Sequence, residues 1–184
     1  MLPNHCPFVG RKQMSIRNQI SAVLVVAAGT FCAAQTAVAD HHAKSGTFEF
    51  VQALNTDYTV VEQSGTTITA GSLKGSVTIT KSSGGPFEEG SSQTQVAVIY
   101  IKKSAAGIDL IADGIQTDSD GDKRFVNGRR SAGDIVVGGG GKGTQEIIGG
   151  TGKYEGITGN CEYTVVYLPE NRIVTTGTCE WQRN

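Results

Sequence analysis

The sequence predicts an all-β protein, an antiparallel barrel of about eight strands. Three observations support this. Short runs of β-branched and aromatic residues recur between turn-forming segments. No window carries apolar residues at the helical period of about 3.6 residues. Cys161 and Cys179 lie at equal distances from a Pro-Glu-Asn turn near the C-terminus. We favour a barrel over a sandwich because closure leaves no exposed strand edge.

The expected strands follow one another with short connections, and 23 of the 25 glycines lie after residue 39, which disfavours long helices. We expect the run from residue 66 to residue 80 to break near Gly71. Turn-rich segments separate the runs, among them SSGGP, SDGD and GGGGKG. The strand-like runs cover residues 46–54, 58–63, 66–80, 93–103, 108–117, 123–128, 134–138 and 143–148, followed by a C-terminal hairpin.

Residues 1–39 have the pattern of a cleaved secretory signal peptide. They contain three basic residues and no acidic residue, and an apolar run at 20–34 precedes an Ala-x-Ala site at 37–39. This run is shorter than the about 20 apolar residues of a comfortable membrane span. We therefore expect a protein exported to the periplasm or the extracellular space, with no stable membrane span after cleavage. Either Met1 or Met14 is the true start.

Removal of 39 of the 184 residues leaves 145, enough for a single barrel domain at residues 40–184. This part of the chain holds 13 basic and 17 acidic side chains, a net charge of −4. A nucleic-acid partner would require a basic face, so we expect none. The one basic cluster directly follows three aspartates, and we expect it to form a solvated mixed-charge surface. Its members are Lys123, Arg124, Arg129 and Arg130.

The C-terminal hairpin predicts a disulfide between Cys161 and Cys179. A three-residue loop at residues 169–171 would pair Leu168 with Arg172, two positions that add to 340, as do the two cysteine positions. Directly opposed residues of antiparallel strands have Cα atoms about 4.5–5.5 Å apart, which suits a disulfide. Such a bridge in an exported chain should stabilise the fold by about 3 kcal/mol. A bulge at Asn171 would shift this register.

The same register divides the hairpin side chains between two faces. Tyr163 would lie opposite Gly177, which leaves room for its ring above the glycine. The face expected to point to the core carries Cys161, Tyr163, Val165, Tyr167, Ile173, Thr175, Cys179 and Trp181. The face expected to point mostly to water carries Glu162, Thr164, Val166, Thr176, Thr178 and Glu180.

Residues 143–159 read GTQEIIGGTGKYEGITG. A strand leads into a glycine-rich corner, where we expect Tyr154 and Ile157 to plug one end of the barrel. Together with the strand pattern, this segment resembles the small eight-stranded barrels of the allene oxide cyclase and dirigent type, in which a similar segment precedes the last two strands. The segment TDSDGDKRF, residues 117–125, also resembles one found in exported bacterial proteins of this pattern. The resemblance covers about residues 93–184. It implies the fold and suggests a cofactor-free isomerase or cyclase, but the catalytic residues of the family match no positions here.

Two segments suggest metal sites. Asp118, Asp120 and Asp122 alternate as calcium ligands do, but an EF-hand needs glycine and an acid where Lys123 and Arg129 stand, and an Asp-Gly turn is the alternative. Cleavage after residue 39 would place His42 third in the chain, where it could bind Cu(II) or Ni(II) in a square plane; a disordered polar tail is the alternative.

Other familiar sites are excluded. The only histidines after residue 39 are His41 and His42, so a histidine-based catalytic triad and a multi-histidine zinc site are ruled out. In GGGGKGT, Gly143 follows Lys142 where a phosphate-binding loop needs Ser or Thr. We therefore expect no cofactor.

Catalysis, if present, would use carboxylates, tyrosines or arginines. A carboxylate buried in a barrel gains a raised pKa and can act as a general acid or base, whereas most acidic side chains face water. The carboxylate candidates within strand-like runs are Glu49, Glu62, Asp109 and Glu146. The tyrosines that could orient a ligand are Tyr58, Tyr100 and Tyr163.

Three functions remain open at this point. The first is a barrel that binds a small apolar or aromatic molecule. The second is a cofactor-free isomerase or cyclase, as the family resemblance implies. The third is a structural or interaction module with a filled barrel. Relatives of this barrel type often associate, so a homo-oligomer is a further expectation by resemblance. The fold does not decide among these functions, and we favour the first.

Overall fold

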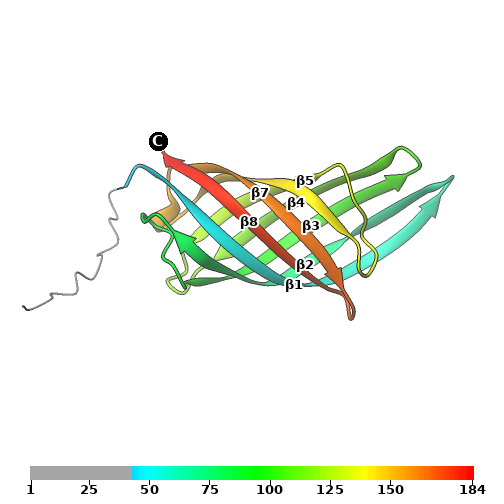
Figure 1. The fold of residues 1–184 in the computed structure, drawn as a ribbon, viewed down its shortest axis with the longest axis horizontal. Helices are drawn as coiled ribbons and strands as arrows, with labels where there is room; N and C mark the ends of the chain where they lie inside the picture. The colour runs from blue at the N-terminus through cyan, green and yellow to red at the C-terminus, as the bar shows by residue number, and fades with distance from the viewer. Residues whose placement is uncertain (1–42) are drawn as a thin grey trace, which may run out of the picture. The chain divides into compact units, whose positions relative to one another are not determined.

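The computed structural model describes residues 43–184, which form a closed antiparallel barrel (Figure 1). Each strand pairs with the next in sequence, and β8 returns to pair with β1. The predicted all-β barrel is therefore confirmed, whereas the expected signal peptide lies outside the described residues. The strands are β1 Ser45–Gln63, β2 Thr66–Ser82, β3 Ser92–Ser104, β4 Gly107–Thr117, β5 Lys123–Arg130, β6 Gly140–Gly150, β7 Ile157–Leu168 and β8 Arg172–Arg183, with a short 3-10 helix, η1 Gly152–Tyr154, between β6 and β7.

Three strand predictions were wrong in detail. The runs at 46–54 and 58–63 form one strand, because the polar residues between them continue the pairing with β2. Gly71 does not break β2; it pairs with Tyr58 at a point where a side chain would collide with the β1 backbone. Residues 134–138 belong to the connection between β5 and β6 rather than to a strand.

The C-terminal hairpin has the predicted register. Leu168 pairs with Arg172, and Cys161 pairs with Cys179 across a Cα–Cα distance of 4.0 Å, with the two sulfurs bonded. No bulge shifts the register at Asn171, which adopts a positive φ of 56° in the turn. The residues predicted to face the core are buried or half-buried, and those predicted to face water are exposed.

One detail of the hairpin differs from expectation. Tyr163 lies opposite Gly177 as predicted, but the ring of Phe50 from β1 covers that glycine. The ring of Tyr163 instead lies over Gly143 of β6. A glycine beside an aromatic residue provides space, but the neighbouring strands determine which ring fills it.

Two clusters of buried side chains fill the barrel, one toward each end. At the end formed by the connections 83–91 and 151–156, here called the aromatic end, the ring centroid of Phe87 lies 4.2 Å from Phe48, 5.5 Å from Trp181 and 5.6 Å from Tyr154. Tyr154 and Ile157 are buried in this cluster, so the prediction that they plug a barrel end is confirmed.

The opposite end, here called the loop end, is formed by the tips of the β1–β2, β3–β4 and β7–β8 hairpins and by the β5–β6 connection, residues 131–139. Its cluster is mainly aliphatic and includes Leu54, Ile101, Leu110 and Tyr167. Within residues 43–184, no helix is long and apolar enough to cross a membrane.

Candidate functional site

The four carboxylate candidates lie on the outer surface of the barrel. Glu49 forms an ion pair with Lys81 at 3.0 Å, and Glu62 accepts a hydrogen bond from the hydroxyl of Thr67 at 2.8 Å. Asp109 and Glu146 are exposed on the outward faces of β4 and β6. The structure therefore brings none of these carboxylates into the barrel interior.

The three tyrosine candidates separate into two groups. Tyr100 is on the outer face of β3 with 47% of its surface exposed. Tyr58 and Tyr163 point inward at the loop end, where both pack against the cluster that contains Tyr167. Burial raises the pKa of Tyr58, and it raises the pKa of Tyr163 to about 12, so both hydroxyls are neutral at physiological pH.

The three alternating aspartates stabilise a turn at the aromatic end. The Asp118 carboxylate accepts hydrogen bonds from the backbone N–H groups of Asp120, at 2.9 Å, and Asp122, at 3.1 Å. The ammonium of Lys153 lies 2.7 Å from Asp118 and 3.1 Å from Asp120, and the backbone N–H of Lys153 donates to Asp122. Burial alone would raise the pKa of Asp118, but the hydrogen bond and charge of Lys153 and the backbone hydrogen bond from Asp120 together outweigh it and hold this pKa below its usual value.

These contacts give the aspartates a role in joining the β4–β5 turn to η1. Within residues 43–184, no group of three or more His, Cys, Asp or Glu side chains is arranged to hold a metal ion. His42 lies outside the described residues, so the copper hypothesis stays untested.

The prediction that the four basic residues form a solvated surface cluster is only half correct. Lys123 and Arg129 are exposed, but Arg124 and Arg130 are 1% and 3% exposed and point into the barrel. Strand alternation is the physical reason, because even-numbered residues of β5 share the inward face of Val126. That alternation was present in the sequence, but the adjacent aspartates and lysine made the segment look like a surface.

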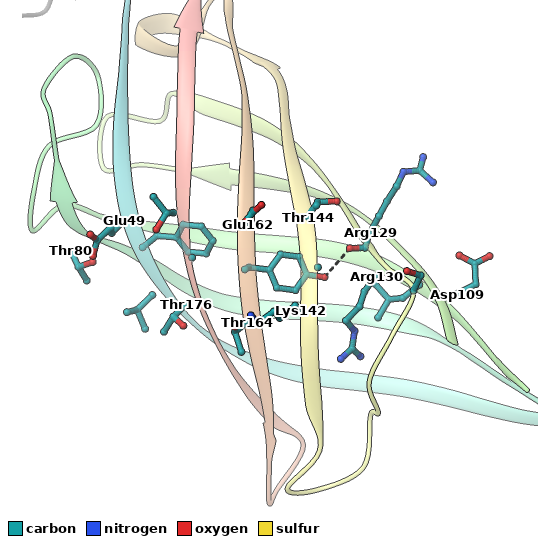
Figure 2. Close-up of a pocket in the computed structure, with 18 residues that line it drawn as sticks. Glu49, Thr80, Asp109, Arg129, Arg130, Lys142, Thr144, Glu162, Thr164 and Thr176 are labelled. Carbon is teal, nitrogen blue, oxygen red and sulfur yellow. Dashed lines mark hydrogen bonds between the residues drawn. The ribbon is translucent and has the colours of Figure 1, made fainter. Parts of the chain in front are cut away.

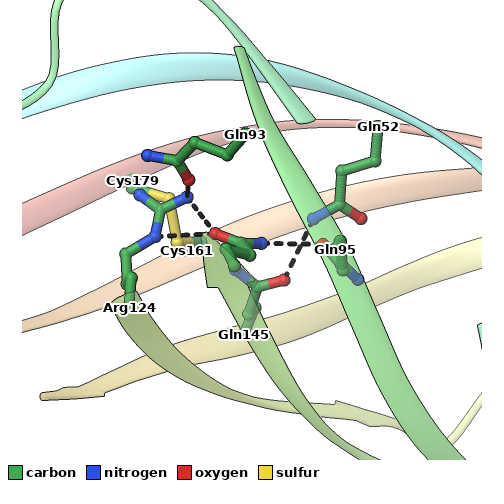
Figure 3. Close-up of a disulfide and its surroundings, with 8 residues drawn as sticks. Gln52, Gln93, Gln95, Arg124, Gln145, Cys161 and Cys179 are labelled. Carbon is green, nitrogen blue, oxygen red and sulfur yellow. Dashed lines mark hydrogen bonds between the residues drawn. A yellow bond between two sulfur atoms is a disulfide. The ribbon is translucent and has the colours of Figure 1, made fainter. Parts of the chain in front are cut away.

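Arg124 lies between two aromatic rings at the aromatic end. Its guanidinium carbon is 5.0 Å from the ring centroids of both Phe48 and Phe87. Nε donates to the side-chain oxygen of Gln116 at 2.6 Å, and Nη2 donates to those of Gln116 and Gln93 (Figure 3). Burial lowers the pKa of Arg124, yet an arginine stays charged at neutral pH.

Inward-facing glutamines extend this polar layer across the barrel. The side chain of Gln116 also donates to Gln95 at 2.8 Å, and Gln52 donates to Gln145 at 3.4 Å (Figure 3). The hydroxyl of Tyr154 accepts a hydrogen bond from Gln93 at 2.6 Å. A buried polar layer of this kind is stable because most of its amides and its cation have partners.

A cavity of about 60 Å³ lies between this layer and the loop end. Three glutamines, one arginine, two tyrosines and one threonine contribute its polar lining, and aliphatic side chains contribute most of the rest. Such a mixture of an apolar wall and a few convergent polar groups is typical of small-molecule sites. The polar lining consists of Gln52, Gln95, Gln145, Arg130, Tyr163, Tyr167 and Thr175.

Arg130 is the charged group of this cavity. Nη2 donates to the Tyr167 hydroxyl at 3.1 Å, Nη1 donates to the Asp134 carbonyl oxygen at 3.2 Å, and the guanidinium lies 5.5 Å from the Tyr167 ring centroid. Its Nε is buried with no hydrogen-bond partner, as is the Tyr58 hydroxyl. No carboxylate of residues 43–184 forms a salt bridge with Arg130, so its charge is compensated only by neutral groups.

The β5–β6 connection covers the barrel beside Arg130. Lys103 forms an ion pair with Asp134 at 2.7 Å, and the hydrogen bond from Lys103 lowers the pKa of Asp134. Backbone hydrogen bonds join Gly138 and Gly139 to Tyr167 at 2.8 and 3.0 Å. Ile135 packs on the aliphatic cluster. A modest number of polar contacts therefore holds this connection over the cavity end.

A larger groove of about 960 Å³ lies on the outer surface of β1, β8, β7 and β6 and is open to solvent. Figure 2 shows its threonines and charged residues, which include the sequence candidates Glu49 and Asp109. Arg130 and Tyr163 line both this groove and the interior cavity, but the other charged residues labelled in Figure 2 are exposed or half-exposed and keep their contact with water. We therefore regard the smaller interior cavity as the candidate site.

Comparisons with models of known protein families, with curated protein sequences and with solved structures found no match for this chain.

Proposed function

We propose that the barrel binds a small molecule in its interior cavity, with an anionic or strongly accepting group of the ligand against Arg130 and its apolar part against the aliphatic wall. The observation that carries this proposal is a buried guanidinium that lines a cavity, lacks a carboxylate partner and keeps one N–H unpaired. Burial of an uncompensated charge is unfavourable, and a ligand anion would remove that penalty.

The cavity volume limits the ligand. About 60 Å³ exceeds the roughly 30 Å³ that a water molecule occupies in the liquid, but it is smaller than the roughly 150 Å³ of a cavity that holds benzene. A head group such as a carboxylate fits. An aromatic or longer apolar body would need the 131–139 connection to move away from Tyr167, and its few polar contacts make that movement feasible.

A cofactor-free isomerase or cyclase has less support. Such an enzyme of the type expected would use a buried carboxylate, whereas the four candidates are on the outer surface. The likeness to allene oxide cyclase and dirigent barrels stays a proposal, supported by the eight-stranded closed barrel and by Tyr154 and Ile157 at the glycine-rich corner. Export is likewise a proposal, supported by the N-terminal sequence and by the disulfide.

Binding can be tested by isothermal titration with benzoate and hexanoate, with benzamide and hexanamide as uncharged controls. We expect the carboxylates to bind more tightly than the amides, and Arg130→Gln to weaken their binding at least tenfold, because the ligand charge loses its partner. Arg129→Gln is the matched control, since it removes the same charge from the exposed side of the same strand.

Native mass spectrometry of protein purified from its own source would complement the titration by revealing a co-purifying small molecule. A wild-type protein that binds neither acid and carries no ligand would contradict the proposal and favour a structural module. Equal affinity of the wild type and Arg130→Gln would contradict the role of Arg130.

A further inference from the structure

Strand β1 extends past its partner β8. It pairs with β8 from Ser45 to Asn55 but with β2 as far as Gln63. The hairpin of β1 and β2 consequently projects beyond the β7–β8 turn (Figure 1). Within residues 43–184, residues 57–63 have a strand partner on the β2 side only, so this stretch of β1 forms an open edge of the barrel.

The last hydrogen bond between β1 and the β7–β8 turn shows which residues of 57–63 direct their unpaired N–H and C=O groups to the open side. The N–H of Thr56 donates to the Asn171 carbonyl oxygen at 2.7 Å, on the side where β8 lies. In an antiparallel pair, successive residues direct their N–H and C=O groups to alternate sides. No bulge interrupts the register with β2 beyond this point. The N–H and C=O groups of Tyr58, Val60 and Glu62 therefore face the open side.

This edge lacks most of the features by which proteins protect exposed strands. It contains no proline and no lysine, and it is seven residues long. Val60 and Val61, which point to opposite faces of the strand, are 56% and 54% exposed. An extended edge of this kind is a template for pairing with another strand.

We propose that this edge pairs with the same edge of a second copy of the chain, in antiparallel register about a two-fold axis at Val60. Such an interface is isologous, because the same residues serve on both sides. In this register Tyr58 lies opposite Glu62 of the second copy, so the residues whose backbone groups face outward oppose one another. Each of them exchanges both of its backbone hydrogen bonds with its counterpart.

The side chains of the edge are compatible with this register. Val60 meets Val60, and Thr59 meets Val61, which places β-branched residues directly opposite one another. The two acidic residues, Asp57 and Glu62, lie opposite Gln63 and Tyr58 rather than opposite each other. A register centred on Glu62 would instead oppose two carboxylates, which is unfavourable. The edge is thus self-complementary in this register, which fits a second copy of the chain, and the pairing does not depend on the proposed ligand site.

The variant Val60→Pro tests the proposal with little expected damage to the monomer. Proline removes an N–H that faces the open side, so the hydrogen bonds between β1 and β2 are kept, and proline is tolerated at strand edges of this kind. We expect the wild type to be a dimer by light scattering and Val60→Pro to have half that mass. The thermal unfolding midpoint and the circular dichroism spectrum of each protein verify that both are folded. Val60→Lys, which opposes two charges at the axis, should also be monomeric.

A cysteine cross-link tests the register. With Cys6 and Cys32 replaced by serine, Val60→Cys should form an intermolecular disulfide on oxidation, because opposed Cα atoms would be about 5.5 Å apart. Gln63→Cys is the matched control; its copies would be about 20 Å apart and should not cross-link. A monomeric wild type, or a dimer that persists in both Val60→Pro and Val60→Lys, would overturn the proposal. Equal cross-linking of both cysteine variants would overturn the register.

Discussion

The two ends of the barrel each bury an arginine without a carboxylate partner, but the groups that contact the arginine differ between the ends. Arg124 at the aromatic end lies between two phenylalanine rings and donates to two glutamine side chains; its Nη1 alone has no partner. Arg130 at the loop end has one ring beside it, donates to one hydroxyl and one carbonyl, and lines a cavity.

The surroundings of a buried charge decide what it can do. A guanidinium surrounded on both faces and bonded to oriented amides contributes to the packing of the core. A guanidinium beside a cavity, with a single ring and a loop connection over it, has room for a ligand group, as the proposed function requires. Burial is almost the same for both arginines, so their surroundings, rather than their exposure, distinguish them.

The largest expected effect comes from replacing Arg124 by methionine, with Arg130→Met as its counterpart at the other end. Arg124→Met should lower the free energy of unfolding by about 3 kcal/mol, because it leaves the oxygens of Gln93 and Gln116 without their charged donor and removes two cation–π contacts. Arg130→Met should change it by about 1 kcal/mol or less, since a buried charge with few partners is replaced by an apolar side chain. Urea unfolding of both variants checks this, and equal losses would remove the distinction between the two ends.

A smaller effect is expected at alkaline pH, to which buried tyrosines at both ends of the barrel contribute, Tyr154 at the aromatic end and Tyr163 at the loop end among them. Burial raises the pKa of both Tyr154 and Tyr163 to about 12, whereas an unfolded chain releases the tyrosine proton near pH 10. Between these values the unfolded state binds fewer protons than the folded state, so stability falls as pH rises. We expect a loss of about 1–3 kcal/mol over this range.

Phenylalanine variants separate the two tyrosines. Tyr163→Phe should be nearly neutral at pH 7, because its hydroxyl donates only a long hydrogen bond of 3.4 Å to the Arg129 carbonyl oxygen. Tyr154→Phe should destabilise the protein even at pH 7, because it leaves the Gln93 amide without its 2.6 Å bond. Each variant should flatten part of the alkaline loss in urea titrations at pH 8–12, and a profile that neither variant changes would contradict this assignment.

The smallest effect concerns the ion pairs near each end. Asp118→Asn should reduce the free energy of unfolding by about 0.5 kcal/mol after screening by solvent. Because the folded-state pKa of Asp118 is lowered, this contribution is present above about pH 4 and is lost as pH falls through the lowered value. Asp134→Asn at the loop end, where the carboxylate is more exposed, should cost less. The difference between wild type and Asp118→Asn in urea unfolding at pH 7 and pH 2 checks the sign, and a difference that grows in acid would contradict it.

Much of the fold was predictable from local features of the chain. Turn residues and β-branched runs predicted most of the strands, and the symmetry of Cys161 and Cys179 about the turn predicted the register and the disulfide. The wrong details have local causes too. Residues 55–57 are polar and interrupt the strand-like pattern, but pairing with β2 keeps them extended, and Gly71 permits the close approach of β1 rather than a break.

The candidate site was only partly predictable. The sequence indicated Tyr163, which lines the cavity, and Tyr58, which packs against the same cluster, but it also indicated four carboxylates that lie outside the barrel. It placed Arg130 on the surface, because charged residues that follow three aspartates usually face water.

The sequence by itself determined the strand pattern, the hairpin register and the pairing of the two cysteines, because each depends on residues close together in the chain. Only the tertiary structure decided which arginine is enclosed by rings and which one faces a cavity, and where β1 loses its partner. Those features depend on contacts between strands distant in sequence, such as β1 with β8 and Arg124 with Phe48. Closure of the barrel brings these residues together, and a local sequence pattern does not predict which distant residues will meet.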